Sequence, residues 1–247
     1  MGILNVTPDS FADGGKHNDF EAAIARGLEM IAEGVDVIDI GGESTRPGAE
    51  RVTEEEEIAR TIPVITELAK HGTTISIDTM RASTAEAAVK AGASIINDVS
   101  GGLADGAMLQ TAARLNVPYI AMHWRGHSKD MNFKAIYGDV VSEALSELNE
   151  RIEAALDAGI HKDNLIIDPG IGFAKDAEHN WAIIDSIDRF VSTGYPVLVG
   201  ASRKRFLGGE SPDEREQATI ELTKRLGTAG VWAVRVHSVK PHKEVLS

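Results

Sequence analysis

The stretch TISIDTMRASTAEAAVKAGASIIND, residues 74–98, contains one complete unit of the pattern that decides the fold of this chain. Its first short apolar run ends on Asp78, and its second ends on Asn97 and Asp98. The Ala-rich segment between the two runs favours a helix, which Gly92 ends. This order predicts a β-α-β unit with polar residues at the carboxyl end of each strand.

The same unit recurs along the whole chain. Eight short apolar runs, separated by stretches rich in Ala, Glu, Leu and Lys, lead into Asn5, Asp39, Asp78, Asn97, His123, Asp168, Ser202 and Arg235. Eight such units within 247 residues predict an α/β fold, a single (β/α)8 TIM barrel over residues 1–247. Because the active site of such a barrel forms where its strands end, we expect these polar residues to meet at one rim.

Caps and glycines predict the helices that separate the strands, at about 19–33, 54–71, 82–90, 107–115, 139–158, 178–192 and 213–225. Thr53 and Glu56 have the spacing of a capping box. The long connections 7–18 and 123–138 are expected to be lids or walls of a substrate site. The barrel looks trimmed at its N-terminus and in its eighth helix, because only 241–247 remain after the last strand.

Composition narrows the class of protein and of partner. The chain carries 38 acidic and 25 basic residues, a formal net charge of −13, so we expect no nucleic-acid partner. The lack of cysteine excludes thiol catalysis, and no long uncharged apolar stretch predicts a membrane span. Polar residues interrupt the first apolar run too early for a signal peptide, and we therefore expect a cytoplasmic location.

Three strands end on groups that accept hydrogen bonds, namely Asp78, Asn97 and Asp168. Two carboxylates and an amide that face one cavity can bind the donor edge of a flat heterocycle, or stabilise a developing positive charge. Each residue taken singly can instead cap the helix that follows, and local sequence does not separate these alternatives.

Cationic side chains follow other strands. Arg235 and His237 are two residues apart, so they share one side of the last strand and Val236 faces the other. This spacing predicts an anion site. Arg46 follows the paired glycines Gly41-Gly42 and can bind phosphate or carboxylate through two parallel hydrogen bonds.

The segment after the first strand contains oxygen ligands suited to Mg²⁺. Asn5 offers a neutral oxygen, and Asp9 and Asp13 offer carboxylates that suit a hydrated Mg²⁺ held against phosphate. A turn capped by the same Asp side chains is an equally simple interpretation. Both interpretations stay open at this point.

Other chemistries fit less well. The histidines lack metal-ligand spacing on one helix, which disfavours zinc. Ser202 has no G-x-S-x-G setting and no evident histidine-acid pair to activate it. Trp124, Trp181 and Trp232 are interpreted as packing residues rather than stacking platforms.

Six motifs, taken together, are highly specific: MGILNVTPDSF at 1–11, DIGGESTRPG at 39–48, NDVSGG at 97–102, DPGIGF at 168–173, SRK at 202–204 and RVH at 235–237. Over nearly the whole chain they resemble, in order, the motifs of the bacterial dihydropteroate synthases, which are pterin-binding enzymes. One departure is Ser238, because the family commonly has an acidic residue after the histidine.

The resemblance implies a transferase that joins p-aminobenzoate to 6-hydroxymethyl-7,8-dihydropterin diphosphate in folate biosynthesis and releases diphosphate. The residues implied for the pterin are Asp78, Asn97, Met122, Asp168, Phe173 and Lys204. Those implied for diphosphate and Mg²⁺ are Asn5, Arg46, Arg235 and His237, with Asp9 and Asp13 acting through water. Those implied for p-aminobenzoate, with which sulfonamides compete, are Phe11, Thr45, Pro47, Ser202 and Lys204.

The resemblance also implies a mechanism in which the catalytic residues are Asp78, Asp168, Lys204, Arg235 and His237. Diphosphate leaves first, in an SN1-like step, and the carboxylates stabilise the pterin cation that remains. The small-molecule substrates are then the main partners, together with a second copy of the chain, since a homodimer is expected. A methyltransferase acting between a folate and a corrinoid protein, and a non-catalytic pterin-binding paralogue or remnant, are the weaker alternatives.

Overall fold

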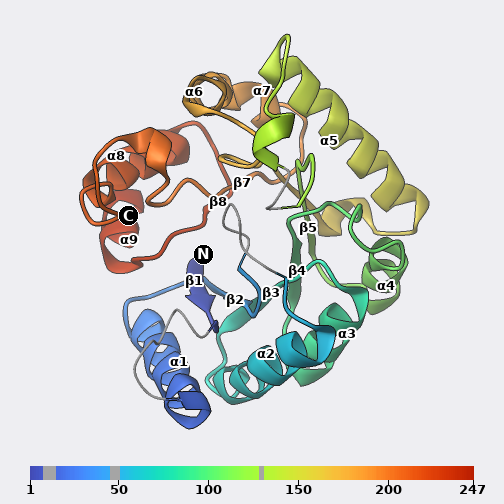
Figure 1. Cartoon of the computed structure of the whole chain (residues 1–247), viewed down its shortest axis with the longest axis vertical. Coiled ribbons are helices and arrows are strands. Elements are labelled where there is room, and N and C mark those ends of the chain that lie inside the picture. Colours follow the sequence, from blue (N-terminus) through green and yellow to red (C-terminus); the bar gives the residue numbers. More distant parts are fainter. Residues whose placement is uncertain (8–14, 45–50, 128–130) are drawn as a thin grey trace.

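A ring of parallel strands surrounded by helices forms the body of the molecule (Figure 1), and this computed structural model describes residues 1–7, 15–44, 51–127 and 131–247. The eight strands are β1 (Gly2–Asn5), β2 (Val37–Gly41), β3 (Thr74–Asp78), β4 (Ile95–Asp98), β5 (Tyr119–Met122), β6 (Leu165–Asp168), β7 (Leu198–Val199) and β8 (Ala233–Val234). Each occurs where an apolar run predicts it. The predicted α/β barrel architecture is therefore present.

The ring is not one closed sheet. Strands β1 to β6 form a six-stranded parallel sheet in sequence order, and β7 pairs only with β8. Single bridges, Ile167 with Val197 and Gly2 with Val236, join the two sheets at two seams. At the first seam the carbonyl of Pro196 accepts from Ile167 N at 2.9 Å, but proline has no N–H to donate back.

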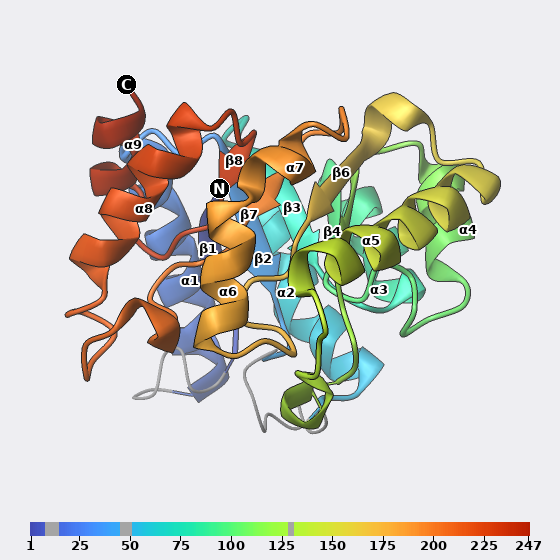
Figure 2. The ribbon, with the colours of Figure 1, turned by 90° about the horizontal axis from the view of Figure 1, so that it is seen from above.

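Helices form the outer layer on all sides of the ring (Figures 1 and 2). They are α1 (Gly15–Ala32), α2 (Glu54–Ala69), α3 (Ala82–Ala91), α4 (Met108–Leu115), α5 (Val140–Asp157), α6 (Ala177–Asp185), α7 (Ile187–Val191), α8 (Glu216–Thr228) and α9 (Lys240–Leu246). The described ranges also contain three short 3₁₀ helices, η2 (Met131–Lys134), η3 (Lys162–Asn164) and η4 (Arg205–Leu207). No helix in the described ranges is long and apolar enough to span a membrane.

The helices differ from the predictions at three boundaries and one cap. The helix α1 begins at Gly15 rather than near residue 19. The helix predicted over 178–192 is divided into α6 and α7, because Ser186 has φ −111° and ψ 24°, outside the helical region. The helix α8 begins at Glu216 rather than near residue 213. At the start of α2, Thr53 accepts a hydrogen bond from Glu56 N at 3.2 Å, while the Glu56 side chain pairs with Arg60 instead of completing the capping box.

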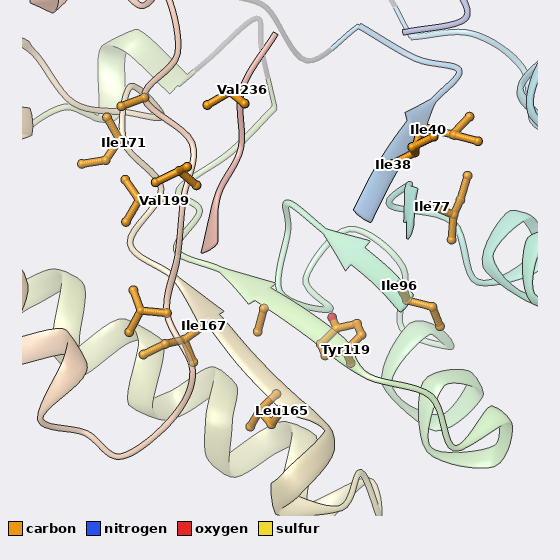
Figure 3. Close-up of a cluster of buried hydrophobic side chains, with 14 of the residues drawn as sticks. Ile38, Ile40, Ile77, Ile96, Tyr119, Leu165, Ile167, Ile171, Val199 and Val236 are labelled. Atoms are coloured by element: carbon orange, nitrogen blue, oxygen red, sulfur yellow. The ribbon is translucent and has the colours of Figure 1, made fainter. Parts of the chain in front are cut away.

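Both faces of the strands are buried, as expected for a parallel barrel. One face packs against the helices, and Figure 3 shows part of this cluster, with Ile38, Ile40, Ile77, Ile96, Tyr119, Leu165, Ile167, Ile171, Val199 and Val236 labelled. The other face fills the inside of the ring with Val37, Ile95, Ile120, Ile166 and Leu198. Two positions after Val37, Ile95, Ile120 and Ile166, and after Ala233, which packs against this cluster, come Asp39, Asn97, Met122, Asp168 and Arg235. Strand alternation thus places the polar residues at the inner carboxyl rim.

Candidate active site

Arg235 joins carboxylates from two strands on the opposite side of a seam. Its Nε donates to Asp39 Oδ2 at 2.5 Å, and its Nη2 donates to Asp78 Oδ2 at 2.7 Å. Asn97 Nδ2 donates to the same Asp39 oxygen at 3.0 Å. One hydrogen-bonded group therefore joins residues of β2, β3 and β4 to the residue that follows β8.

The charges in this group are almost completely removed from water. Asp39 is fully buried and Asp78 is 7% exposed. Burial raises the pKa of Asp78 to about 7, although Arg235 opposes the rise. Burial alone would lower the pKa of Arg235, but Asp39 and Asp78 outweigh it and raise the pKa above its ordinary value. Arg235 therefore stays charged, with two of its nitrogens already bound to carboxylates.

A second group surrounds Asp168. Its Oδ1 accepts from Gly170 N at 2.7 Å, within the loop that follows β6. Burial raises the pKa of Asp168, whereas the Gly170 hydrogen bond and the charge of Lys204 lower it. Lys204 Nζ donates to the carbonyl of Ile171 and lies 4.7 Å from the centre of the Phe173 ring. Burial lowers the pKa of Lys204 to about 8.

Residues near the Arg235 group and the Asp168 group form an apolar surface. Met80, Val99 and Met122 form a small buried cluster, against which Trp124 and Phe173 pack. The predicted pterin residues Met122 and Phe173 are thus in one cluster. Trp124 packs as interpreted from the sequence. Trp181 is 38% exposed and packs edge-on against Phe206, with ring centroids 5.4 Å apart, and Trp232 is 43% exposed.

Ser202 and His237 form a pair that the sequence did not reveal. Ser202 is 5% exposed, and its Oγ lies 3.0 Å from His237 Nδ1 and 3.3 Å from the His237 backbone nitrogen. The next residue, Ser238, accepts from Arg203 Nη2 at 2.8 Å, and Arg203 Nε donates to Glu216 at 2.7 Å. Ser238 therefore helps to anchor Arg203 between the segments that follow β7 and β8.

Two buried carboxylates lie beside predicted site residues without having been assigned a role. Asp39 lies in the middle of β2 and bonds Arg235 and Asn97, and strand alternation was the signal that could have found it. Asp98 is different, because it faces away from the inner rim. It accepts from Tyr119 Oη at 2.8 Å and from the backbone nitrogens of Ser100 and Gly102, both at 2.8 Å. Its contacts anchor the loop after β4.

The first strand ends on Asn5, which is half-buried and has its predicted place at the rim. Six further predicted residues lie outside the described residues: Asp9, Phe11, Asp13, Thr45, Arg46 and Pro47. Within the described residues there is no cluster of three or more His, Asp or Glu side chains that could hold a metal ion. Asn5 alone offers one hard oxygen ligand, which suits Mg²⁺, because that ion keeps several waters and binds substrate phosphate.

Comparison with known proteins identifies the family. The family model for pterin binding enzymes matches residues 1–237. Dihydropteroate synthase of Bacillus subtilis (strain 168) is 49% identical over 97% of this chain and 83% of that protein. Dihydropteroate synthase of Mycobacterium leprae (strain TN) is 46% identical over 100% of this chain and 90% of that protein. The chain belongs to the dihydropteroate synthase family. Members of this family are transferases.

Solved structures of the family have the same fold. A dihydropteroate synthase of Xanthomonas albilineans with 4-aminobenzoic acid superimposes with a TM-score of 0.94 at 44% identity, covering 100% of this chain and 89% of that one. The same enzyme with 7,8-dihydropteroate gives 0.90 at 41% identity, covering 100% and 90%. A Yersinia pestis dihydropteroate synthase in a sulfonamide complex gives 0.93 at 37% identity, covering 100% and 90%.

Proposed function

We propose that this chain transfers the dihydropterin-methyl group of 6-hydroxymethyl-7,8-dihydropterin diphosphate to p-aminobenzoate, producing dihydropteroate and diphosphate for folate biosynthesis. The observation that carries the proposal is the pair of buried carboxylates, Asp78 and Asp168, at one rim with Asn97 between their strands. The dihydropteroate held by a 41% identical relative supports it.

The pterin ring is a flat heterocycle whose amino and ring N–H groups need acceptors. Asp78, Asn97 and Asp168 supply acceptor oxygens, and because these residues are almost completely buried, each hydrogen bond to a ligand would form away from water. Met122 and Phe173 supply apolar contact for the ring faces. Lys204, beside Phe173, would then lie at the edge of the bound ring.

The reaction begins with loss of diphosphate. The bond between the pterin methylene carbon and the diphosphate oxygen breaks, and its electron pair leaves with the oxygen. The positive charge left on the methylene group is delocalised into the ring, where Asp78 and Asp168 stabilise it electrostatically. The amine nitrogen of p-aminobenzoate then forms the new C–N bond and loses a proton to solvent. An arylamine needs no strong base for this step.

The leaving diphosphate needs cationic partners. His237 is half-buried with its Nδ1 beside Ser202 Oγ, and an imidazole is a group that can donate to a phosphate oxygen. Arg235 is engaged by Asp39 and Asp78, but its Nη1 makes no hydrogen bond within the described part of the chain. We assign these two residues, with Asn5 and Arg46, to the diphosphate. Arg235 would thereby connect the leaving group to the carboxylate that stabilises the cation.

Mg²⁺ is the proposed cofactor, with the side-chain oxygen of Asn5 as the direct ligand and Asp9 and Asp13 acting through water. The donor is of the right chemical type, since Mg²⁺ takes oxygen ligands and is commonly bound by few protein groups together with substrate phosphates. When bound, the ion would neutralise charge on the leaving diphosphate.

The second substrate is proposed to bind beside the segments after β7, β1 and β2. Ser202 and Lys204 belong to this pocket among the described residues, and Phe11, Thr45 and Pro47 are assigned to it by motif. The sulfonamide bound by the Yersinia pestis relative supports the same pocket as the site of drug competition.

One barrel domain, 1–247, would carry all of these sites, in a cytoplasmic homodimer. The dimer is tested by analytical ultracentrifugation.

The deciding experiment is diphosphate release measured with both substrates and Mg²⁺, with and without p-aminobenzoate, together with mass detection of dihydropteroate. We expect product only when both substrates are present. The Asp168→Asn variant should bind p-aminobenzoate pocket ligands but lose turnover by about 10²-fold or more, because one stabilising charge is removed. Binding of pterin diphosphate without any product would instead support a non-catalytic pterin-binding protein.

A further inference from the structure

Lys175 is a buried lysine that the proposed reaction does not use. The residue is 8% exposed, and its Nζ contacts three acceptors: His123 Nδ1 at 2.8 Å, the Gly170 carbonyl at 3.0 Å and the Phe173 carbonyl at 3.1 Å. An ammonium has three N–H donors, so this site satisfies all of them. Because all three donors are paired, we infer that the Lys175 ammonium has a specific structural role.

The carbonyls that Lys175 binds belong to the loop between Asp168 and Lys175. Gly170, Gly172 and Ala174 have φ values of +69°, +78° and +47°, so three residues of this short loop are in the left-handed region. A Cβ at Gly170 would lie 2.3 Å from the His123 carbonyl oxygen, which shows how closely the loop approaches β5. A backbone of this kind persists only when its surroundings hold it.

His123 is a firmly held hydrogen-bond partner of Lys175. Its side chain is 1% exposed, and burial with the nearby charge of Lys175 lowers its pKa to about 4, so the imidazole is neutral at neutral pH. Nε2 lies 2.9 Å from Glu147 Oε2, and Arg125 Nε donates to the same carboxylate. Nε2 therefore carries the proton and donates it to Glu147, which leaves the Nδ1 lone pair to accept from Lys175.

The lysine is also coupled to the pterin carboxylate. Burial lowers the pKa of Lys175 to about 7, and the negative charge of Asp168 is the main influence that raises it. The backbone strengthens this link, since His123 N donates to the Asp168 carbonyl at 2.8 Å. Residues from α5, β5 and the loop after β6 thus converge on the position of Asp168.

We propose that Lys175 is a positioning residue for the pterin pocket. By holding the carbonyls of Gly170 and Phe173 against His123, it sets where Asp168 and the Phe173 ring face the substrate. The proposal rests on the proposed function, because that function assigns Asp168 and Phe173 to the pterin. Among the described residues, the p-aminobenzoate residues Ser202 and Lys204 make no hydrogen bond to the Lys175 ammonium, and Lys204 acts on it as a nearby charge.

The test is a steady-state comparison of Lys175→Met with the unaltered enzyme, because methionine keeps the unbranched stem and removes the donors. We expect the KM for pterin diphosphate to rise at least about tenfold, as for loss of other supporting contacts around ligand-binding groups. The KM for p-aminobenzoate, measured at saturating pterin diphosphate, should rise by less than about threefold, because Ser202 is held by His237 outside the loop, whereas Lys204 binds the Ile171 carbonyl within it. Lys90→Met, at an exposed lysine paired only with Glu86, is the matched control.

Two variants of His123 show whether a rise in KM reflects a lost contact with Lys175 rather than a loss of folding. His123→Asn keeps an acceptor near the Nδ1 position and should restore most of the pterin affinity that His123→Leu loses. Equal rises in both KM values, or an unchanged KM for pterin diphosphate in both Lys175→Met and His123→Leu, would overturn the positioning role. If the unaltered chain makes no dihydropteroate, the proposed function itself fails; if it does and the variants match it, only the role of Lys175 fails.

Discussion

Asp78 and Asp168 are the same residue type at equivalent places, yet they are held in different ways. Each ends a strand on the inner face of the ring, and burial raises the pKa of both carboxyls. Asp78 is bound by the side chain of Arg235, which lies 157 residues away in sequence. Asp168 is bound by the backbone of Gly170, two residues away, while Lys175 and Lys204 act on it as nearby charges.

The difference separates two kinds of dependence. The environment of Asp78 depends on closure of the ring of strands. Its cationic partner Arg235 follows β8, on the other side of a seam. The Asp168 end depends on one local loop and the residues that hold it. Changes in β8 should therefore disturb the first carboxylate and changes in the loop after β6 the second. Three substitutions test whether the two ends are separable.

The largest effect is expected from Arg235→Leu. This change leaves Asp39 and Asp78 buried without their cation, and removing one partner of a buried ion pair costs about 3–5 kcal/mol. Urea unfolding should show a correspondingly lower free energy of unfolding. Arg225→Leu is the control, because Arg225 and its partner Asp185 are 48% and 62% exposed, and such a pair contributes about 1 kcal/mol or less. A similar small loss in both variants would contradict the buried role of Arg235.

An intermediate effect is expected from Asp78→Asn, seen in the pH profile. The pKa of Asp78 is raised to about 7, so the carboxyl is protonated below that pH and ionised above it. If the ionised form stabilises the pterin cation, kcat/KM for pterin diphosphate rises with pH through about 7. The Asn variant should lack this limb and be slower by about 10²-fold at pH 8. Retention of the limb by the Asn variant, or its loss in Asp168→Asn, would reverse the assignment.

The smallest effect is expected from Asn180→Ala at the Asp168 end. Asn180 Oδ1 accepts from Gly172 N at 2.6 Å and is 2% exposed, so the change leaves a buried N–H without its acceptor. The expected loss of unfolding free energy is about 1–3 kcal/mol. Asn164→Ala, which removes an exposed hydrogen bond to Asn116, should change stability by about 0.5 kcal/mol or less. The pH limb assigned to Asp78 should be unchanged in both variants.

The sequence was sufficient for the architecture and for the residues that end strands. Apolar runs that end on Asp78, Asn97 and Asp168 are local patterns, and a parallel ring brings such ends to one rim whatever the details of packing. Local sequence patterns did not predict the two seams between the sheets. They arise from the short pairing of β7 and β8, which the apolar runs 197–199 and 231–234 do not by themselves reveal.

Residues that act through partners on other segments were the ones missed. Asp39 gains its importance from Arg235, and His123 gains its importance from Lys175, which lies 52 residues later. Neither pair has a fixed spacing that a motif could contain. The sequence showed no evident histidine-acid pair for Ser202. The contact of its hydroxyl with His237, at 3.0 Å, arises because β7 and β8 are neighbours in space.

The seams have a consequence for how the barrel can deform. Displacing a strand inside the β1 to β6 sheet breaks a ladder on each side, whereas shifting β7 and β8 together breaks one isolated bridge at each flank. These two strands precede the segments that carry Ser202, Lys204, Arg235 and His237. If diphosphate leaves past Arg235 and His237 as proposed, its side of the ring is the one with fewer backbone bonds to its neighbours, and the Arg235 pairs with Asp39 and Asp78 then brace it across the seam.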